Sequence, residues 1–427
     1  MSTLKAVRGT RDLLPPETEL WNFVDETARR VFARYNFGEI RTPIFEDTQL
    51  FARGVGEETD IVSKEMYTWE DRARAQSEKA QSLTLRPENT AGVVRAYIEH
   101  KLGETGLLQK LYYIGPQFRR ERPQKGRYRQ FWQIGAEVIG PPSAGSESPL
   151  RDAEVLEMLA TFLDELGITD WRLEINSVGS ATDRPRYLAE LREALAPVKH
   201  FMCEDNQRRA ETNPLRVLDS KDPNDQEIIE KLPKIADYLD ESSKAHFAAV
   251  LAALDSCGVR YTVNPRLVRG LDYYTRTTFE FTHGGLGAQN ALLGGGRYDG
   301  LSEAIGGPKA PGIGFAMGED RLILTLEAQA ARAATLADAY VAPMGEALNP
   351  AALALAHELR RSGLRVELGD GRFRLSKSFE MGHKLARKIV LLGEDEQRSG
   401  ILTVKDFASR EQVKVPRAEL AAVLGTK

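Results

Sequence analysis

Basic residues are concentrated between residues 119 and 129, where six of them accompany a single acid. Arginine carries a fork of N–H donors that matches a phosphate group, so this segment suggests anion binding. A bare run of charge is more often a solvated loop. The residues that follow favour a site instead, because alternation along a strand places unlike chemical groups on one face. They are a cation, an aromatic ring, an amide and a carboxylate: Arg129, Phe131, Gln133 and Glu137.

A sheet face of this composition does not suit a hydrophobic core, since buried polar groups cost free energy unless they are partnered. We therefore expect the face to line a ligand site. Phe131 offers a plane on which a base can stack. Arg119, at the end of the facing strand, can point into the same space and contact a phosphate. The pattern indicates a nucleotide-binding site.

Two further arginines are candidates for anion binding, and each has a simpler alternative. Arg321 falls in the first turn of a helix expected to begin near residue 318, where helix amides already favour an anion, but it could equally be an exposed side chain. Arg269 precedes a strand that opens with Tyr273 and Tyr274. Paired aromatic residues in a strand are usually packing residues, whereas an arginine beside a glycine is harder to explain by packing.

The elements that position these residues follow from hydrophobic periodicity and turn residues. Two strands joined by the charged loop 120–126 form a hairpin, and a polar, mostly helical stretch interrupts the strand pattern as an insertion. The predicted elements are a helix at 12–36 started by two prolines, a strand at 38–46, an exposed loop at 70–82, a helix from about 89 to 102, strands at 111–119 and 127–140, a helix at 152–166, the insertion at 180–256, a strand at 261–283, and strand, turn and helix at 312–327.

The last quarter of the chain has a different pattern. Residues 328–337 are rich in alanine and carry no strand signal, so we expect a linker. Strands and helices alternate after it, which is typical of a small α/β domain. Residues 365–388 carry seven basic and three acidic side chains, so this patch is a candidate RNA-facing surface.

Composition excludes several classes of protein. The chain has 427 residues, 58 basic and 62 acidic, and a net charge of -4, so a polyanion must be bound through a local patch. Two cysteines are too few for a disulfide framework or a CxxC metal site. No apolar run reaches the roughly 20 residues of a membrane span, and the first residues carry no export signal. We expect a cytoplasmic protein with no membrane contact.

Five segments in a fixed order resemble the class II histidyl-tRNA synthetases of bacteria, and the resemblance runs over nearly the whole chain. They are LRPENTA at 85–91, FRRERPQKGRYRQFWQIGAE at 118–137, RGLDYYTRTTFEF at 269–281, LLGGGRYDGL at 292–301 and GIGFAMGEDR at 312–321. The combination of the RPQKGRYRQF hairpin with RGLDYY is specific to that family.

The resemblance implies an α+β fold. A class II catalytic domain over residues 1–327 would hold an antiparallel sheet of about six strands with helices on one face and the helical insertion at 180–256. A linker at 328–337 would lead to an anticodon-binding α/β domain at 338–427. The TPIFE region at 42–46 corresponds to the family's first motif, which forms a dimer interface, so a homodimer is expected.

The resemblance also implies roles for site residues. The histidine pocket falls on Glu88, Thr90, Gln133, Glu137, Tyr273 and Tyr274. The ATP site falls on Arg119 at the α-phosphate, Arg127 and Arg321 at the γ-phosphate, and Phe131 against adenine. Arg269 corresponds to the arginine that lies against the α-phosphate and the substrate carboxylate, which makes Arg269 and Arg119 the expected catalytic residues.

The implied reaction has two steps. L-Histidine reacts with ATP, in the presence of Mg²⁺, to give histidyl-adenylate and pyrophosphate, and the histidyl group then moves to the 3′ end of tRNA(His). Glu88 would accept hydrogen bonds from the substrate ammonium. Glu137 and a tyrosine hydroxyl would bond the imidazole nitrogens. Two anions meet in the first step, so charge neutralisation by arginine and Mg²⁺ would dominate catalysis.

Some features depart from the family pattern or allow other functions. Asn89 replaces the glycine of the usual PEGTA, Asp320 precedes Arg321, and a regular strand would place Tyr273 and Tyr274 on opposite faces. A regulatory subunit of ATP phosphoribosyltransferase uses the same fold without catalysis. RLSKS at 374–378 resembles a class I synthetase loop, but no HIGH-like motif accompanies it. A plain RNA-binding module would leave the carboxylate–tyrosine pocket without a purpose.

Overall fold

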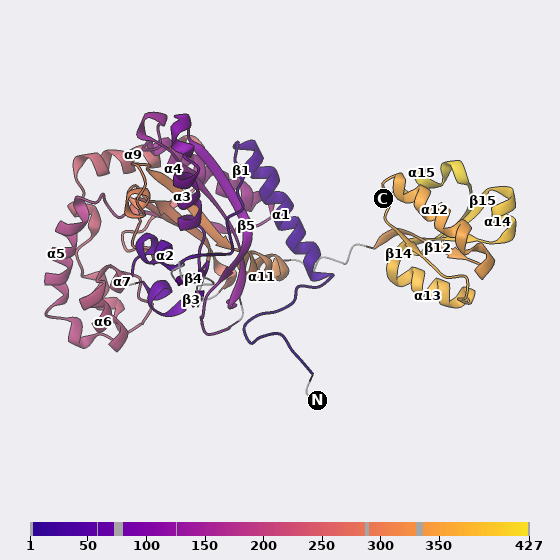
Figure 1. Ribbon diagram of the computed structural model, residues 1–427, viewed down its shortest axis with the longest axis horizontal. Coiled ribbons are helices and arrows are strands. Elements are labelled where there is room, and N and C mark those ends of the chain that lie inside the picture. The colour runs from indigo at the N-terminus through magenta and orange to yellow at the C-terminus, as the bar shows by residue number, and fades with distance from the viewer. Residues whose placement is uncertain are drawn as a thin grey trace. The chain divides into compact units, whose positions relative to one another are not determined.

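The structure is a computed structural model that describes residues 3–57, 59–71, 80–124, 126–286, 290–329 and 336–425. The chain divides into two units, Met1–Arg332 and Ala333–Lys427, and each is described here by itself (Figure 1). In the part of the chain that is described, no helix is both long and apolar enough to cross a membrane.

An eight-stranded sheet organises the first unit. Its order is β1-β5-β6-β11-β10-β9-β7-β8, and the six central strands pair antiparallel, as predicted for the fold. The short edge strands β1 and β8 are additional and pair parallel with their neighbours. The bounds are Gly38–Glu39 for β1, Gln109–Phe118 for β5, Gln130–Ile139 for β6, Trp171–Ser177 for β7, Tyr261–Val263 for β8, Thr275–His283 for β9, Ala291–Arg297 for β10 and Gly312–Gly318 for β11.

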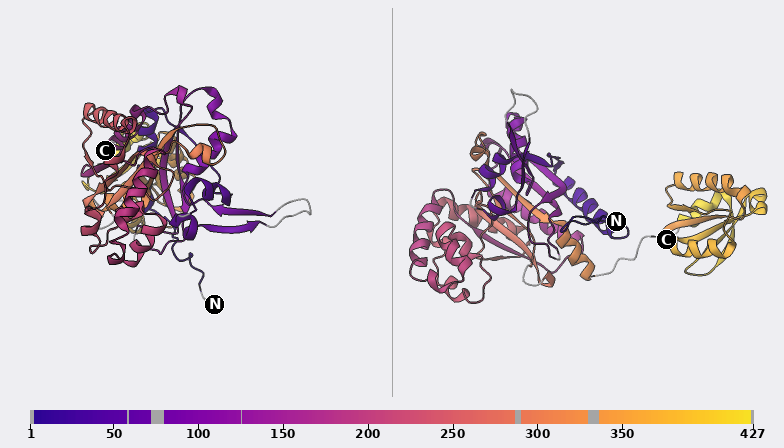
Figure 2. Two further views of the ribbon diagram at one scale, coloured as in Figure 1. Left: turned by 90° about the vertical axis from the view of Figure 1, so that its left-hand side faces the viewer. Right: turned by 60° about the horizontal axis from the view of Figure 1, so that its bottom comes forward.

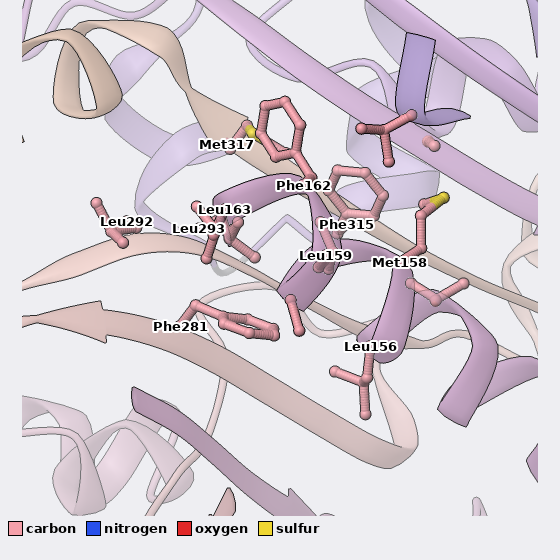
Figure 3. Close-up of a cluster of buried hydrophobic side chains, with 14 of the residues drawn as sticks. Leu156, Met158, Leu159, Phe162, Leu163, Phe281, Leu292, Leu293, Phe315 and Met317 are labelled. Carbon is pink, nitrogen blue, oxygen red and sulfur yellow. The ribbon is translucent and has the colours of Figure 1, made fainter. Parts of the chain in front are cut away.

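Four helices cover one face of this sheet and form a large apolar core with it. They are α1 (Glu17–Arg34), α4 (Pro149–Glu165), α9 (Glu241–Ser256) and α11 (Glu319–Gln329). Figure 3 shows the apolar side chains of α4 beside those of β9, β10 and β11. The α4 positions 156, 159 and 163 recur at helical spacing, so they form one stripe toward the sheet. The predicted helices at 12–36 and 152–166 are confirmed in α1 and α4.

The alternation predicted for the second hairpin strand decides which face carries the site. Ile134, Ala136 and Val138 of β6 point into the helix-covered core. Gln133 and Glu137 therefore point to the opposite face. The face opposite the helices is the one that carries polar side chains.

A second, three-stranded sheet has the order β2-β4-β3. The single strand predicted at 38–46 is wrong, because β1 and β2 belong to different sheets. The chain bends between them, and the Arg86 guanidinium fills the bend by donating to the carbonyl oxygens of Thr42 and Pro43. In Figure 2, β3 and β4 project from the body of the unit. Of the loop predicted at 70–82, residues 70–71 belong to β3 and residues 81–82 to β4, so the prediction is wrong there, and residues 72–79 lie outside the described residues. The bounds are Phe45–Asp47 for β2, Tyr67–Asp71 for β3 and Gln81–Leu85 for β4.

The segment predicted as an insertion is helical but divides between two cores. Its first four helices enclose a core of their own. The last helix, α9, instead packs on the main sheet through Val250 and Leu254, because its apolar stripe faces α4. The other helices are α5 (Asp183–Leu195), α6 (Glu204–Thr212), α7 (Leu215–Leu218) and α8 (Gln226–Glu230).

The second unit contains a five-stranded sheet of order β13-β12-β14-β15-β16, in which the first three strands pair parallel and the last two antiparallel. The RLSKS residues 374–378 form the start of α13, within this sheet-and-helix unit. Of the predicted linker, residues 328 and 329 belong to α11 and residues 330–335 are outside the described residues. The bounds are Ala337–Pro343 for β12, Asn349–Arg361 for α12, Val366–Leu368 for β13, Leu375–Leu385 for α13, Ala386–Leu392 for β14, Ile401–Asp406 for β15 and Gln412–Pro416 for β16.

Candidate active site

A cavity of about 230 Å³, here called the main cavity, opens on the polar face of the large sheet. Ten of the eleven residues predicted for the site line it. They are Glu88, Thr90, Arg119, Arg127, Phe131, Gln133, Arg269, Tyr273, Tyr274 and Arg321. These residues come from four of the five motif segments, so the fold brings together what the motifs only suggested.

Each of the two predicted arginines of the hairpin, Arg119 and Arg127, has its own contact partners. Arg119 donates through Nε to the Pro87 carbonyl at 2.9 Å, and its guanidinium lies 5.3 Å from the centre of the Phe131 ring. Arg127 lies 3.4 Å from a carboxylate oxygen of Glu121. A phosphate donor and a stacking ring are therefore adjacent, as a nucleotide requires.

Arg321 stands in the first turn of α11 and donates to the Ala291 carbonyl at 2.8 Å. Burial lowers its pKa, and the positive charge of Arg127 lowers it further. The like charges of Arg127 and Arg321 disfavour each other, so an anion between the two guanidinium groups would stabilise both. This end of the main cavity is suited to a polyphosphate.

Arg269 lies flat against the sheet. Its Nη1 donates to Glu280 at 2.8 Å. A Cβ atom on Gly294 would lie 2.6 Å from that nitrogen, so the glycine of β10 leaves the space that the guanidinium occupies. The glycine run at 294–296 therefore allows close packing inside the sheet.

Glu88 supplies a buried carboxylate to the lining of the main cavity. Its carboxylate accepts hydrogen bonds from the backbone N–H groups of Thr90 at 2.8 Å and Ala91 at 3.0 Å, in the first turn of α3 (Thr90–Glu99). Burial raises the pKa of Glu88, while these bonds and Arg119 oppose the rise. A fixed carboxylate at this point is suited to an ammonium group.

Glu137 is the predicted residue that lies outside the described cavity lining. It is fully buried, and its two oxygens accept hydrogen bonds from the hydroxyls of Thr90 and Tyr298, both at 2.7 Å. Burial raises the pKa of Glu137 to about 8. Gly314 makes the room, because a Cβ atom there would lie 1.7 Å from the carboxylate. Glu137 is thus connected to the main cavity through Thr90, which lines it.

Tyr273 and Tyr274 both line the main cavity, so the opposite-face expectation from a regular strand is wrong for them. The reason is that β9 begins only at Thr275, and the two tyrosines lie before it. Their ring centres are 4.7 Å apart. Burial raises the pKa of each hydroxyl, which keeps its proton available for donation.

The two departures from the family motifs, Asn89 and Asp320, are each held by another side chain of the same unit. The Asn89 side chain accepts a hydrogen bond from the Thr42 hydroxyl at 2.5 Å. Asp320 binds Arg11, with an N–O distance of 2.9 Å. Arg297, from the glycine-rich motif, is fully buried and pairs with Asp152. These residues stabilise the walls of the site.

Several cavity residues were missed. Their polar members are Glu121, Tyr128, Glu280 and Asp320. Glu280 could have been found by alternation, because Phe279 and Phe281 on either side of it belong to the core. Arg129 was expected on the cavity face but precedes β6, and its guanidinium donates instead to the Arg8 carbonyl.

Comparison with known proteins gives a consistent result. The family model for histidyl-tRNA synthetase matches residues 9–322, and the model for the anticodon binding domain matches residues 338–427. The histidine–tRNA ligase of Koribacter versatilis is 71% identical over 98% of this chain and 95% of its own length. That of Solibacter usitatus is 56% identical over 99% of both chains.

A solved structure agrees with these relatives. The apo histidyl-tRNA synthetase of S. aureus superposes with a TM-score of 0.79 at 36% identity, covering 99% of this chain and 100% of that one. The match extends over both units and includes the sheet that carries the main cavity. The chain belongs to the histidyl-tRNA synthetase family.

Proposed function

We propose that the main cavity holds L-histidine and ATP side by side, with histidine between Glu88 and the two tyrosines and the triphosphate against the arginines. The activity of the chain is that of a histidine–tRNA ligase, whose substrates are L-histidine, ATP and tRNA(His). The observation that carries the assignment of roles is that one cavity is lined both by a carboxylate with two tyrosines, Glu88, Tyr273 and Tyr274, and by four arginines, Arg119, Arg127, Arg269 and Arg321.

The first step needs positioning more than proton transfer. A carboxylate oxygen of histidine attacks the α-phosphorus of ATP, and the bond to pyrophosphate breaks. Arg119 and Arg269 would neutralise the two anions as they approach, which lowers the barrier electrostatically. Arg127 and Arg321 would hold the leaving end of the triphosphate in line. No protein nucleophile is required.

Recognition of histidine would depend on hydrogen bonds that other amino acids cannot make. Each oxygen of Glu137 keeps a second lone pair beside its hydroxyl partner, and an imidazole N–H entering beside Thr90 can use it. The tyrosine hydroxyls can donate to the other imidazole nitrogen. A site built this way rejects non-bonding analogues strongly, because its buried polar groups are then left unpaired.

Mg²⁺ is proposed as a companion of ATP. The chemistry of the donors fits, because Mg²⁺ prefers oxygen ligands and the partly exposed carboxylates of Glu121 and Glu280 line the main cavity. These two residues would hold the ion. When bound, Mg²⁺ supplies positive charge to the phosphate oxygens.

The experiment that tests the amino-acid assignment is ATP–pyrophosphate exchange with each of the twenty amino acids. Exchange with L-histidine alone supports the proposed pocket. Equal or greater exchange with another amino acid contradicts it.

The regulatory-subunit alternative is set aside by the full-length ligase relatives, and the class I and plain RNA-binding alternatives are set aside by family membership.

The second unit is proposed to read the anticodon of tRNA(His), over residues 338–427. Deleting those residues should leave histidine-dependent pyrophosphate exchange within about twofold, because the described residues that line the main cavity all lie in the first unit. Charging of tRNA(His) should fall by at least about a hundredfold, because loss of phosphate and base contacts weakens RNA binding. Unimpaired charging by the truncated chain would contradict the assignment.

We further propose a cytoplasmic homodimer. Phe45 of β2 and Trp69 of β3, the two strands that flank β4, are 52% and 40% exposed and contact each other edge to face. Ile44, in the TPIFE region, is also exposed. An apolar patch of this kind suits an interface. Sedimentation equilibrium measures the mass of the assembly, and a monomer at micromolar concentration would contradict the proposed dimer.

Cys203 and Cys257 are both free thiols, which fits the reducing environment of the cytoplasm.

A further inference from the structure

The segment before α1, coloured indigo in Figure 1, contains a short stretch that packs on the hairpin. Residues 8–11 are here called the N-terminal arm. The Arg129 N–H donates to the Gly9 carbonyl at 2.7 Å, and the Arg129 carbonyl in turn accepts from the Arg119 N–H at 2.9 Å. The arm is therefore hydrogen-bonded to the same backbone that holds a proposed catalytic arginine.

The contacts of Gly9 show how closely the N-terminal arm approaches the hairpin. Its φ of +90° is in the left-handed region, which glycine adopts without steric cost. A Cβ atom there would lie 2.8 Å from the Arg129 side chain and 2.9 Å from Pro123. These two neighbours come from opposite sides of the charged loop. The arm thus packs against both sides of the loop that carries Arg127.

Arg11 connects the hairpin to α11. Its Nη2 donates to Asp320 at 2.9 Å, and its guanidinium carbon lies 4.7 Å from the centre of the Tyr128 ring. Asp320 is the chain neighbour of Arg321, and Tyr128 is the chain neighbour of Arg127. A single side chain is bound to the residues next to both arginines proposed for the end of the triphosphate.

Such a connection has a physical purpose. The half-buried Arg321 and the nearby Arg127 carry like charges and disfavour each other until an anion binds. The hairpin and α11 are separate elements, so without a connection the two guanidinium groups could move apart in the empty site. A charge-assisted hydrogen bond and a cation–ring contact from one planar group restrict that movement.

We propose that Arg11 is a positioning residue for ATP, which sets the spacing of Arg127 and Arg321 before the triphosphate binds. The proposal rests on the proposed function, because it takes those two arginines as phosphate ligands. Arg11 is outside the described cavity lining, so it acts through Asp320 and Tyr128.

The test is ATP–pyrophosphate exchange by the full-length chain, with KM measured separately for ATP and histidine. Arg11→Ala should raise the KM for ATP about tenfold, with the histidine KM and kcat changed by less than twofold. Arg11→Lys keeps the positive charge but lacks the planar fork of N–H donors. Its KM for ATP should lie between the values of the unaltered chain and of Arg11→Ala. Arg8→Ala is the matched control, because Arg8 is an exposed arginine of the same arm.

Three results would overturn the positioning role. One is equal ATP KM values for Arg11→Ala and Arg8→Ala. Another is a fall in kcat with both KM values unchanged. The third is a loss of activity in Arg11→Ala that is fully explained by a lower melting temperature, which would mean a role in stability alone. The assumed phosphate role is tested independently by Arg127→Ala and Arg321→Ala, which should each raise the ATP KM; if neither does, the proposed ATP site fails whatever Arg11 does.

Discussion

Replacing Arg269 by alanine is expected to reduce histidine-dependent pyrophosphate exchange by roughly three orders of magnitude. The guanidinium is the group proposed to lie against the α-phosphate and the histidine carboxylate, where two anions meet. Losing one preorganised donor at such a point commonly costs about 10²–10³-fold in rate, and here a full charge is lost as well. The main effect should be on kcat, with modest changes in the KM values for ATP and histidine.

The control for this variant is Arg266→Ala. Arg266 is three residues earlier in the chain and donates to Gln226 at 3.0 Å, outside the described lining of the main cavity. It should retain exchange within about twofold of the unaltered chain. Circular dichroism and melting temperature check that both variants are folded. Exchange by Arg269→Ala within about threefold of the unaltered chain would exclude a catalytic role for Arg269.

Gly294→Ala examines the same guanidinium without removing it. The added Cβ atom would lie within 2.7 Å of three atoms of the Arg269 guanidinium, so the side chain has to move. An ångström-scale displacement of a positioned group is expected to cost about a hundredfold in exchange. A variant that keeps Arg269 yet loses this activity would show that position, beyond charge, matters.

The motifs were most informative where a regular strand carried them. Alternation along β6 separates Gln133 and Glu137 from the core residues Ile134 and Ala136, and the structure agrees with the sequence at each of these positions. The same rule failed at Tyr273 and Tyr274 because it was applied to residues that precede β9. Periodicity describes residues inside an element and carries no information about where the element begins.

The contacts that position the site were beyond sequence reasoning for a different reason. Arg11 and Asp320 are 309 positions apart, and Arg297 and Asp152 are 145 apart. Pairings across such distances depend on the order of strands in the sheet, which no local pattern specifies. The predicted residues that would touch substrate could therefore be read from motifs, while the residues that hold them in place required the fold.

Glycine provides a further example. A glycine run such as that at 294–296 can form a phosphate loop, a tight turn or a close backbone approach. Its function is evident only from what fills the missing side-chain space, which is the Arg269 guanidinium at Gly294 and the Tyr274 ring at Gly296. Residue type indicates that something must come close, and only the tertiary structure identifies it.

Replacing Glu137 by glutamine is the second variant with a large expected effect. The histidine KM should rise about a hundredfold, while the ATP KM changes by less than twofold. The reason is that both oxygens of a carboxyl group can accept hydrogen bonds, whereas an amide replaces one of them with an NH₂ group that only donates. Thr90, Tyr298 and an imidazole N–H all have to donate to this group. Equal losses for histidine and ATP would argue against imidazole recognition.

The same substitution should change how stability depends on pH. The Glu137 carboxyl keeps its proton up to about pH 8 in the folded chain but loses it near pH 4.5 when exposed. Between these values the folded state binds more protons than the unfolded state, so the unaltered chain loses stability as pH rises. Glutamine cannot ionise, so the stability of the Glu137→Gln variant should not fall with rising pH for this reason.

Melting temperatures measured from pH 5 to pH 9 separate these effects. Relative to the unaltered chain, Glu137→Gln should gain several degrees toward pH 9 and lose most of that gain toward pH 5. Glu174→Gln serves as the matched control, because Glu174 lies on β7 of the same sheet, outside the described lining of the main cavity. A parallel pH dependence in all three chains would contradict the raised pKa of Glu137. A variant that is more stable at alkaline pH yet binds histidine less well would mean that the buried carboxylate is retained for recognition at a cost in stability.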